Sequence, residues 1–228
     1  MRIILLFLLI TMGHASTAVA RIALSNVILD IPASGSRFAD IEVTNLARET
    51  AYVETQIAEV LHPGTAREQR VPHVPARDQG LLVSPARMIL PPQGRKNMRF
   101  LAPAPAGEQE RVFRVTVRPV SGEAAKDSSA TALKILVAYE VLVFLAPAQP
   151  SLKVHYERNE NHLVATNRGN VNVLLHDLRQ CPAAPNHTCE EAGGGRLYPG
   201  QTRTFTLPLN SPVEFLQTQA GQNTKLQH

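Results

Sequence analysis

The 228-residue chain contains no tryptophan, and aromatic residues make up only 5% of it. Aliphatic side chains must therefore fill any core that forms. The chain has only 2 cysteines, which excludes a small scaffold held together by many disulfides. Charged residues amount to 18% and hydrophobic residues to 44% of the sequence. That balance excludes an intrinsically disordered chain and supplies enough apolar material for a folded core.

The sequence also lacks the patterns of several function classes. Its formal net charge is +4, but the basic residues are spread along the chain without a concentrated run, which argues against nucleic-acid binding. No Gly-x-Ser-x-Gly, phosphate-binding glycine loop or His-Glu-x-x-His motif occurs. The run Gly193-Gly194-Gly195 has no strand–helix context and is expected to be a loop. We therefore expect no enzymatic activity and no cofactor.

No stretch after the amino terminus is long and apolar enough to cross a bilayer. Met1 and Arg2 precede an uninterrupted apolar run at residues 3–10, which is too short to span a bilayer. Ala18 and Ala20 then provide small residues at the two positions that a signal peptidase reads. We expect residues 1–20 to be a cleaved secretory signal peptide, with an uncleaved anchor as the alternative. The mature protein should then be soluble and exported.

The rest of the chain predicts short β-strands. Residues 38–45 alternate, with Ala39, Ile41 and Val43 on one face and polar side chains on the other, as in a half-buried strand. Further strands follow at intervals of roughly 8–12 residues, joined by turns rich in proline and glycine, and no segment shows a sustained helical period. Residues 23–31 are expected to form the first strand. The pattern favours an all-β protein built from sandwiches.

Two sandwich domains are expected. The sequence APAQP at residues 146–150 indicates a hinge, which places an N-terminal domain at residues 21–147 and a C-terminal β-sandwich at residues 148–228. In the second domain Cys181 and Cys189 lie eight residues apart. Two such cysteines should form a disulfide in an oxidising compartment. A metal or redox site would need further ligands or a Cys-x-x-Cys spacing, neither of which is present.

Residues 131–145 are predicted to form the longest apolar strand, and both of its faces are apolar. Two side-chain sets alternate along it: Leu133, Ile135, Val137, Tyr139, Val141 and Val143 on one face, and Leu136, Ala138, Leu142 and Phe144 on the other. One face should belong to the core of its own domain. The other either lies under a neighbouring sheet or domain, or is exposed for a partner whose groove takes those side chains.

Several segments, taken in order, resemble a known family, the periplasmic pilus chaperones of the chaperone–usher pathway, in their alternate or alpha-fimbrial branch. The likeness covers nearly the whole mature chain. It is carried by GLLVSPARMILPPQGRKNMRF at residues 80–100, ERVFRVTVRPV at 110–120, NRGNVNV at 167–173, the two cysteines, and LYPGQ at 197–201. The resemblance implies two immunoglobulin-like β-sandwich domains in an L-shaped arrangement.

The resemblance also implies a mechanism. A pilin subunit is a sandwich that lacks its last strand, and the chaperone lends one of its own strands until the outer-membrane usher takes the subunit. By the match, residues 131–143 are lent, and Leu133, Ile135, Val137 and Tyr139 are the subunit-binding side chains. The face that carries Ile135 is therefore expected not to be the core of its own domain. Whether the free protein caps itself as a homodimer stays open.

One feature departs from the better-known branch of that family, which anchors the subunit's C-terminal carboxylate with an arginine on the first strand and a lysine on the lending strand. Here residues 23–31 contain no arginine, and Glu140 stands where the lysine would align. Arg114 is the expected substitute, because a guanidinium fork suits a carboxylate. The alternative is that Arg114 only pairs with Glu140 across the strands.

A second hypothesis is a periplasmic β-sandwich that binds a small ligand or copper. His62, His73 and His155 are the candidate ligands, but their spacing carries no metal-binding signal, and histidines in surface loops are the ordinary explanation. We therefore expect no metal site. In the proline-rich region, Ser84-Pro85 or another bond is expected to help fix the turn into the next strand.

Overall fold

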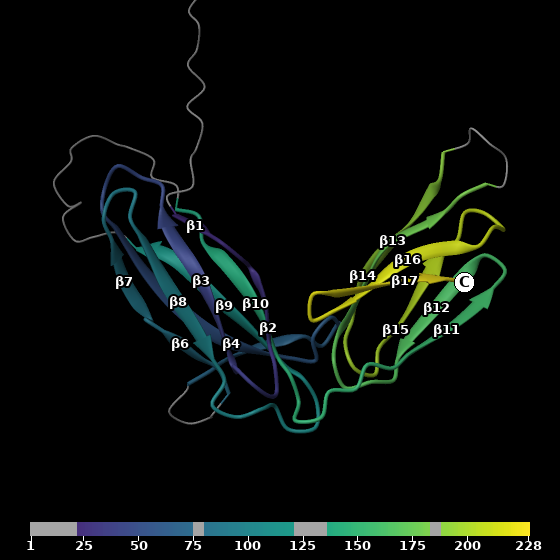
Figure 1. Cartoon of the computed structure of the whole chain (residues 1–228), viewed down its shortest axis with the longest axis horizontal. Helices are drawn as coiled ribbons and strands as arrows, with labels where there is room; N and C mark the ends of the chain where they lie inside the picture. Colours follow the sequence, from purple (N-terminus) through teal and green to yellow (C-terminus); the bar gives the residue numbers. More distant parts are fainter. Residues whose placement is uncertain (1–21, 75–79, 121–135, 183–187) are drawn as a thin grey trace, which may run out of the picture.

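The computed structural model describes residues 22–74, 80–120, 136–182 and 188–228. These residues form four β-sheets, and the sheets pair into two sandwiches that make the arms of an open L (Figure 1). Within the described residues there is no α-helix, and so no helix that could cross a membrane. The expected all-β class with two sandwiches is confirmed.

The first sandwich contains a small and a large sheet. The small sheet has the strand order β1 (Ile22–Leu24), β3 (Phe38–Asn45), β8 (Arg95–Leu101) and β6 (Leu82–Ser84). The large sheet has the order β2 (Ile28–Ile31), β10 (Tyr139–Leu145), β9 (Arg111–Val120), β4 (Ala51–Leu61) and β5 (Gln69–Pro72), and β7 (Arg87–Leu90) pairs with the first half of β4. Its strands are antiparallel except for the parallel pair β2 and β10.

The single first strand expected at residues 23–31 is wrong, because the chain changes sheets there. Strand β1 pairs with β3, and β2 pairs with β10 in the opposite sheet. Two short polar side chains make the turn between them. The Oγ of Ser25 accepts the N–H of Glu42 at 2.9 Å, and the Oδ1 of Asn26 accepts the N–H of Ile28 at 3.0 Å. The switch places β2 beside β10.

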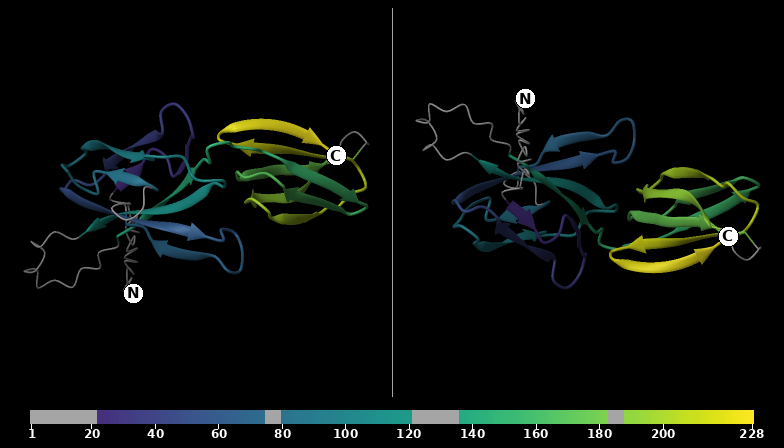
Figure 2. Two further views of the ribbon diagram at one scale, coloured as in Figure 1. Left: turned by 90° about the horizontal axis from the view of Figure 1, so that it is seen from below. Right: turned by 90° about the horizontal axis from the view of Figure 1, so that it is seen from above.

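The second sandwich is smaller. One sheet has the order β11 (Val154–Asn159), β12 (His162–Asn167) and β15 (Thr202–Thr206). The other has the order β14 (Glu190–Leu197), β13 (Val173–Gln180), β16 (Val213–Gln219) and β17 (Gln222–Gln227). Figure 2 shows the β4–β5 hairpin of the first sandwich, drawn in blue, reaching toward the second sandwich.

The loop expected at the glycine run is also wrong, because these glycines lie within β14. The facing strand β13 has an irregular register around Asp177, whose φ is 53°. A Cβ on Gly194 would lie only 2.8 Å from the carbonyl oxygen of Leu175. Glycine therefore lets β14 stay paired where its neighbour bulges, which is the usual meaning of a glycine inside a strand.

Each sandwich has its own apolar core. In the first, Phe113, Val115 and Val117 of β9 are buried, and β10 contributes Val141 and Val143.

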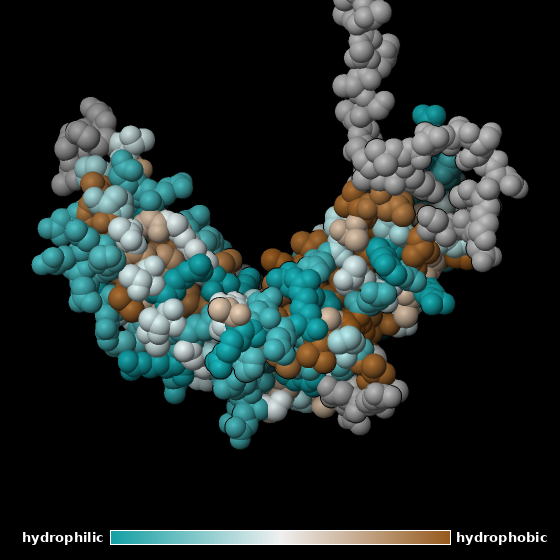
Figure 3. All heavy atoms as spheres, turned by 180° about the vertical axis from the view of Figure 1, so that it is seen from behind, coloured by the Kyte–Doolittle hydropathy of each residue, from teal (hydrophilic) through white to brown (hydrophobic). Residues whose placement is uncertain are grey.

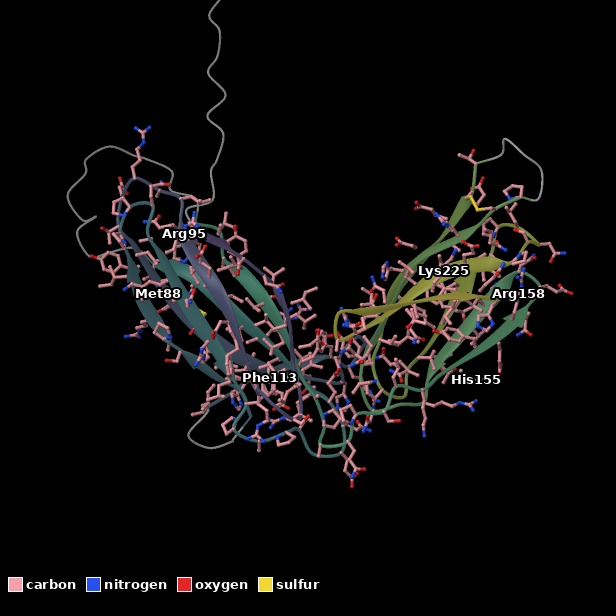
Figure 4. All side chains as sticks on the ribbon, viewed as in Figure 1. Met88, Arg95, Phe113, His155, Arg158 and Lys225 are labelled. Atoms are coloured by element: carbon pink, nitrogen blue, oxygen red, sulfur yellow. A yellow bond between two sulfur atoms is a disulfide. The ribbon has the colours of Figure 1, made fainter. Side chains whose placement is uncertain are left out.

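In the second sandwich, the expected disulfide between Cys181 and Cys189 is present and joins the end of β13 to the start of β14 (Figure 4). Ser84–Pro85, in the turn that precedes β7, is a cis peptide bond.

A third apolar cluster lies at the junction of the two sandwiches. Val60, Val112 and Phe144 are buried there, and Leu142 and Tyr198 pack against them. Tyr198 comes from the second sandwich and the others come from the large sheet of the first. The outer face of the large sheet is therefore covered at one end by the second sandwich.

Candidate functional site

Strand β10 uses its two faces for different contacts. Val141 and Val143 are fully buried in the first core, and Tyr139 packs against that core from a partly buried position. On the opposite face Glu140 is exposed, whereas Phe144 is buried at the junction between the sandwiches. Both faces of the strand's C-terminal half are thus occupied, which accounts for its lack of polar residues after Glu140.

The apolar residues of this segment continue N-terminal to β10, where the core of the domain no longer covers them. Leu136 and Val137 precede β10, lie outside any strand, and are 38% and 42% exposed. Strand β2 pairs with β10 only from Leu142 onward. In the described part of the chain, residues 139–141 have no strand neighbour on that side. Exposed apolar side chains and an open strand edge therefore occur together.

The structure corrects one expectation about the lent residues. Val141 and Val143, which share the sequence parity of Val137, are buried in the core of their own domain, whereas Val137 lies outside any strand and is exposed. The expectation that this face is not core is wrong from Tyr139 onward. Tyr139, the first residue of β10, pairs with Val117 of β9. Leu133 and Ile135 lie outside the described residues.

Further apolar side chains are exposed on the outer face of the large sheet. Tyr52 of β4 pairs with Val120 of β9 on one side and with Ile89 of β7 on the other. Tyr52 is 41% exposed and Ile89 53%. Figure 3 shows hydrophobic residues gathered on this domain.

Arg114 lies on the outer face of β9, opposite Leu142 of β10 and Ala58 of β4. Its Nη1 is 3.4 Å from Oε2 of Glu140, and the other oxygen of Glu140 accepts a 2.6 Å hydrogen bond from Arg70. The ion pair between Arg114 and Glu140 is therefore present. Among the described residues the buried Nε of Arg114 has no hydrogen-bond partner, so the guanidinium keeps a free donor.

Arg114 also lines a cavity at the junction of the two sandwiches. The loop between β4 and β5 contributes Thr65 and Glu68, and the second sandwich contributes a larger group: Arg196, Tyr198, Gln201 and Arg203. The Nε2 of Gln201 donates a 2.5 Å hydrogen bond to the carbonyl oxygen of Pro63, which ties that loop to the second sandwich. Three arginines against one glutamate make this cavity suitable for an anionic group.

Burial changes the pKa values of two side chains that line the cavity, Tyr198 and Arg196. It raises the pKa of Tyr198, although the nearby guanidinium groups of Arg196 and Arg114 oppose that shift. Burial also lowers the pKa of Arg196, against the stabilising charges around it. Tyr198 therefore stays a neutral hydroxyl donor at neutral pH. Sequence reasoning missed Arg196 and Tyr198 because only the folded arrangement of the two sandwiches brings them near Arg114.

The three candidate metal ligands have separate surroundings. His73 lies with Nε2 3.1 Å from the carbonyl oxygen of Leu81 and packs edge-on against Phe113. His155 pairs with Glu157 at 2.9 Å, and His62 occupies a turn with a φ of 52°. Within the described residues, no group of three His, Cys, Asp or Glu side chains is close enough to hold a metal ion.

No family model matches the chain. It is 26% identical over 184 residues to a CFA/I fimbrial subunit of Escherichia coli, covering 77% of this chain and 76% of that protein. It is 29% identical over 128 residues to the probable fimbrial chaperone EcpB of Escherichia coli, covering 55% and 56%. The class 5 fimbriae chaperone CfaA superposes with a TM-score of 0.63 at 21% identity, covering 91% of this chain and 97% of that structure.

These matches define the class of the protein by its fold. The chain has the two-sandwich fold of fimbrial chaperones. Its sequence is similar to those of a fimbrial chaperone and a fimbrial subunit, which confirms the resemblance drawn from the motifs.

Proposed function

We propose that the protein is a periplasmic chaperone that binds pilus subunits, completes their fold with a lent β-strand, and delivers them to the outer-membrane usher. The observation that carries the proposal is the N-terminal end of β10. There the strand edge is open, and Leu136 and Val137 are exposed in a protein with the fimbrial-chaperone fold. The signal-peptide pattern of residues 1–20 supports a periplasmic location.

The lent segment is proposed to extend β10 backward through residues 131–138. Main-chain hydrogen bonds along such a segment fix its register in the subunit, and alternate side chains provide the specificity. Leu133, Ile135 and Val137 would fill the subunit groove, each contributing about 1.5–3 kcal/mol if fully buried. Because this face continues into the domain's own core at Tyr139, the subunit core and the chaperone core would form one continuous apolar layer.

Arg114 is proposed to anchor the subunit's C-terminal carboxylate. Its partly exposed guanidinium and the two further arginines of the cavity support this role. The ion pair with Glu140 is compatible with it, because Glu140 holds one edge of the guanidinium while another donor stays available. The anchor and the lent strand lie on the same pair of strands, β9 and β10, so one subunit can reach both.

Co-expression with open-groove pilin subunits, followed by co-purification, tests the proposal. We expect the wild-type protein to protect and retain a subunit. Ile135→Asp should abolish retention because it brings a charge into an apolar groove. Lys134→Asp is the matched control, since it places the same charge in the same segment at the opposite side-chain parity. Retention by the Ile135 variant, or equal loss in both variants, would contradict the lent-strand assignment.

A further inference from the structure

A single carboxylate lies between two arginines on the outer face of the large sheet. The Oε1 of Glu140 accepts a 2.6 Å hydrogen bond from Nη1 of Arg70, and its Oε2 lies 3.4 Å from Nη1 of Arg114. Arg70 belongs to the edge strand β5, Arg114 to β9 and Glu140 to β10. The three side chains therefore connect β5 with β10 across the two strands that lie between them.

The register of the sheet makes room for this long contact. Strand β5 lies three strand spacings from β10, a distance of roughly 14 Å. Arg70 pairs with Val60 of β4, and the next position on the same face of β4 is Ala58, which pairs with Arg114. Ala58 and Arg70 line the same cavity on this face. The small side chain of Ala58 leaves space for the extended arginine to cross the sheet.

The charges of this group do not cancel. Two guanidinium groups share one carboxylate, which leaves one positive charge. The cavity that contains Arg114 adds Arg196 and Arg203 against Glu68, so it does not supply the missing negative charge. A second carboxylate would give Arg70 and Arg114 one partner each.

The buried nitrogen of Arg114 determines where a second carboxylate can bind. A guanidinium offers a side fork of donors that includes Nε, and an end fork made of its two terminal nitrogens. The Nε of Arg114 is buried, whereas its side chain as a whole is 29% exposed, so the end fork is the accessible one. Glu140 already contacts Nη1 of that fork. A carboxylate that binds the end fork with both oxygens must therefore displace Glu140 from Arg114.

We propose that Glu140 is an internal competitor for the anchor, and that Arg70 holds Glu140 once it is displaced. In the free protein Glu140 contacts both arginines. When the subunit's C-terminal carboxylate binds Arg114, Glu140 gives up this longer contact and keeps the shorter one with Arg70. The inference rests on the proposed function and adds a regulatory step at the same site, because only a carboxylate placed on the end fork of Arg114 completes the exchange.

A neutral isostere of Glu140 distinguishes this exchange from simple positioning of Arg114. Glu140→Gln removes the competitor, so the affinity for a subunit with an intact C-terminus should rise roughly two- to fivefold, the scale of one exposed ion pair. If Glu140 only positioned Arg114, the same variant would bind more weakly. Arg70→Gln should lower the affinity by a similar factor, because Glu140 then has no second partner and stays on Arg114.

Affinities of the purified variants for a subunit with and without its C-terminal residues measure these effects. The double variant should bind as tightly as Glu140→Gln alone, because Arg70 then has no carboxylate to hold. Glu54→Gln is the matched control, since Glu54 accepts a 2.8 Å hydrogen bond from Arg118 on the same face, and it should leave the affinity unchanged. Weaker binding by Glu140→Gln, or an effect of Arg70→Gln that persists in the double variant, would overturn the exchange.

A measurement on the free protein tests the exchange without a subunit, so failure to bind any pilin would refute the proposed function separately. Acetate serves as the minimal carboxylate, and the Nε–H signal of Arg114 in isotopically labelled protein reports its binding by NMR. Glu140→Gln should reach the half-maximal shift at a roughly two- to fivefold lower acetate concentration than wild type, and Glu54→Gln at the wild-type concentration. Equal concentrations for wild type and Glu140→Gln, or no shift in any of these proteins, would overturn the inference.

Discussion

Arg114 shows how a single residue could be identified from sequence while its surroundings could not. The alternation of β9 predicted that Arg114 lies on the outer face, away from Phe113 and Val115, and the burial of those two side chains agrees. Its ion pair with Glu140 was one of the two predicted alternatives and is present. The neighbours supplied by the second sandwich are 82 and 84 residues away in sequence (196 − 114 and 198 − 114), so no local pattern could reveal them.

For this single residue we predict that Arg114→Ala weakens subunit binding without abolishing it. The variant removes a charge-assisted hydrogen bond of about 1.5–3 kcal/mol and leaves the groove contacts intact, so affinity should fall roughly ten- to hundredfold. The measurement is the affinity for subunits with and without their C-terminal residues. Wild type should prefer the intact terminus, and the variant should bind both equally. A preference that survives in the variant would place the anchor elsewhere.

Individual elements were predicted best where hydrophobic alternation is strong. Strand β9 occupies residues 111–120 as expected, and β3 occupies residues 38–45. The glycine-containing β14 and the polar β17 were missed, because their side chains are mostly exposed and carry no apolar period. They are strands because their backbones pair with β13 and β16, a contact that depends on tertiary structure.

Two aspartate variants test where the buried part of the β10 face begins. Val141 is fully buried in the first core, so Val141→Asp should destabilise the isolated protein by more than about 3 kcal/mol. Ile135→Asp, at the same sequence parity but outside the described residues, should leave the free protein folded. Chemical denaturation of both variants compares these effects directly. Equal destabilisation would mean that the core face extends to residue 135 and that this residue is not free to be lent.

At the scale of the whole molecule, the two sandwiches meet at a junction. The sequence indicated the hinge between them but not the contacts of that junction. Phe144 was expected on an apolar face of the long strand, with burial under a neighbouring sheet or domain as one alternative. It is 1% exposed and packs against Tyr198 of the second sandwich. Burial under a neighbouring domain therefore describes the C-terminal half of the predicted strand. Exposure describes Leu136 and Val137, which precede β10.

We predict that Phe144→Ala uncouples the two sandwiches. Removing this ring should cost about 3–5 kcal/mol, concentrated in the junction because the ring does not belong to either main core. Differential scanning calorimetry should resolve the unfolding of this variant into two separate transitions. In the wild-type protein the two sandwiches should unfold in transitions that overlap more closely. Val143→Ala, which truncates the neighbouring residue in the first core, is the control and should lower the stability of the first sandwich alone. A single unchanged transition in Phe144→Ala would show that the junction does not couple the domains.

Hydrogen–deuterium exchange of the chaperone, free and in complex with a pilin subunit, tests the central claim most directly. Lending a strand requires the amides of residues 131–138 to become hydrogen-bonded in the complex, so their exchange should slow strongly on binding. Residues 142–145, which are already paired with β2 and β9, should change little. A complex in which residues 131–138 exchange as fast as in the free protein would contradict the account, because the subunit would then be held by another surface.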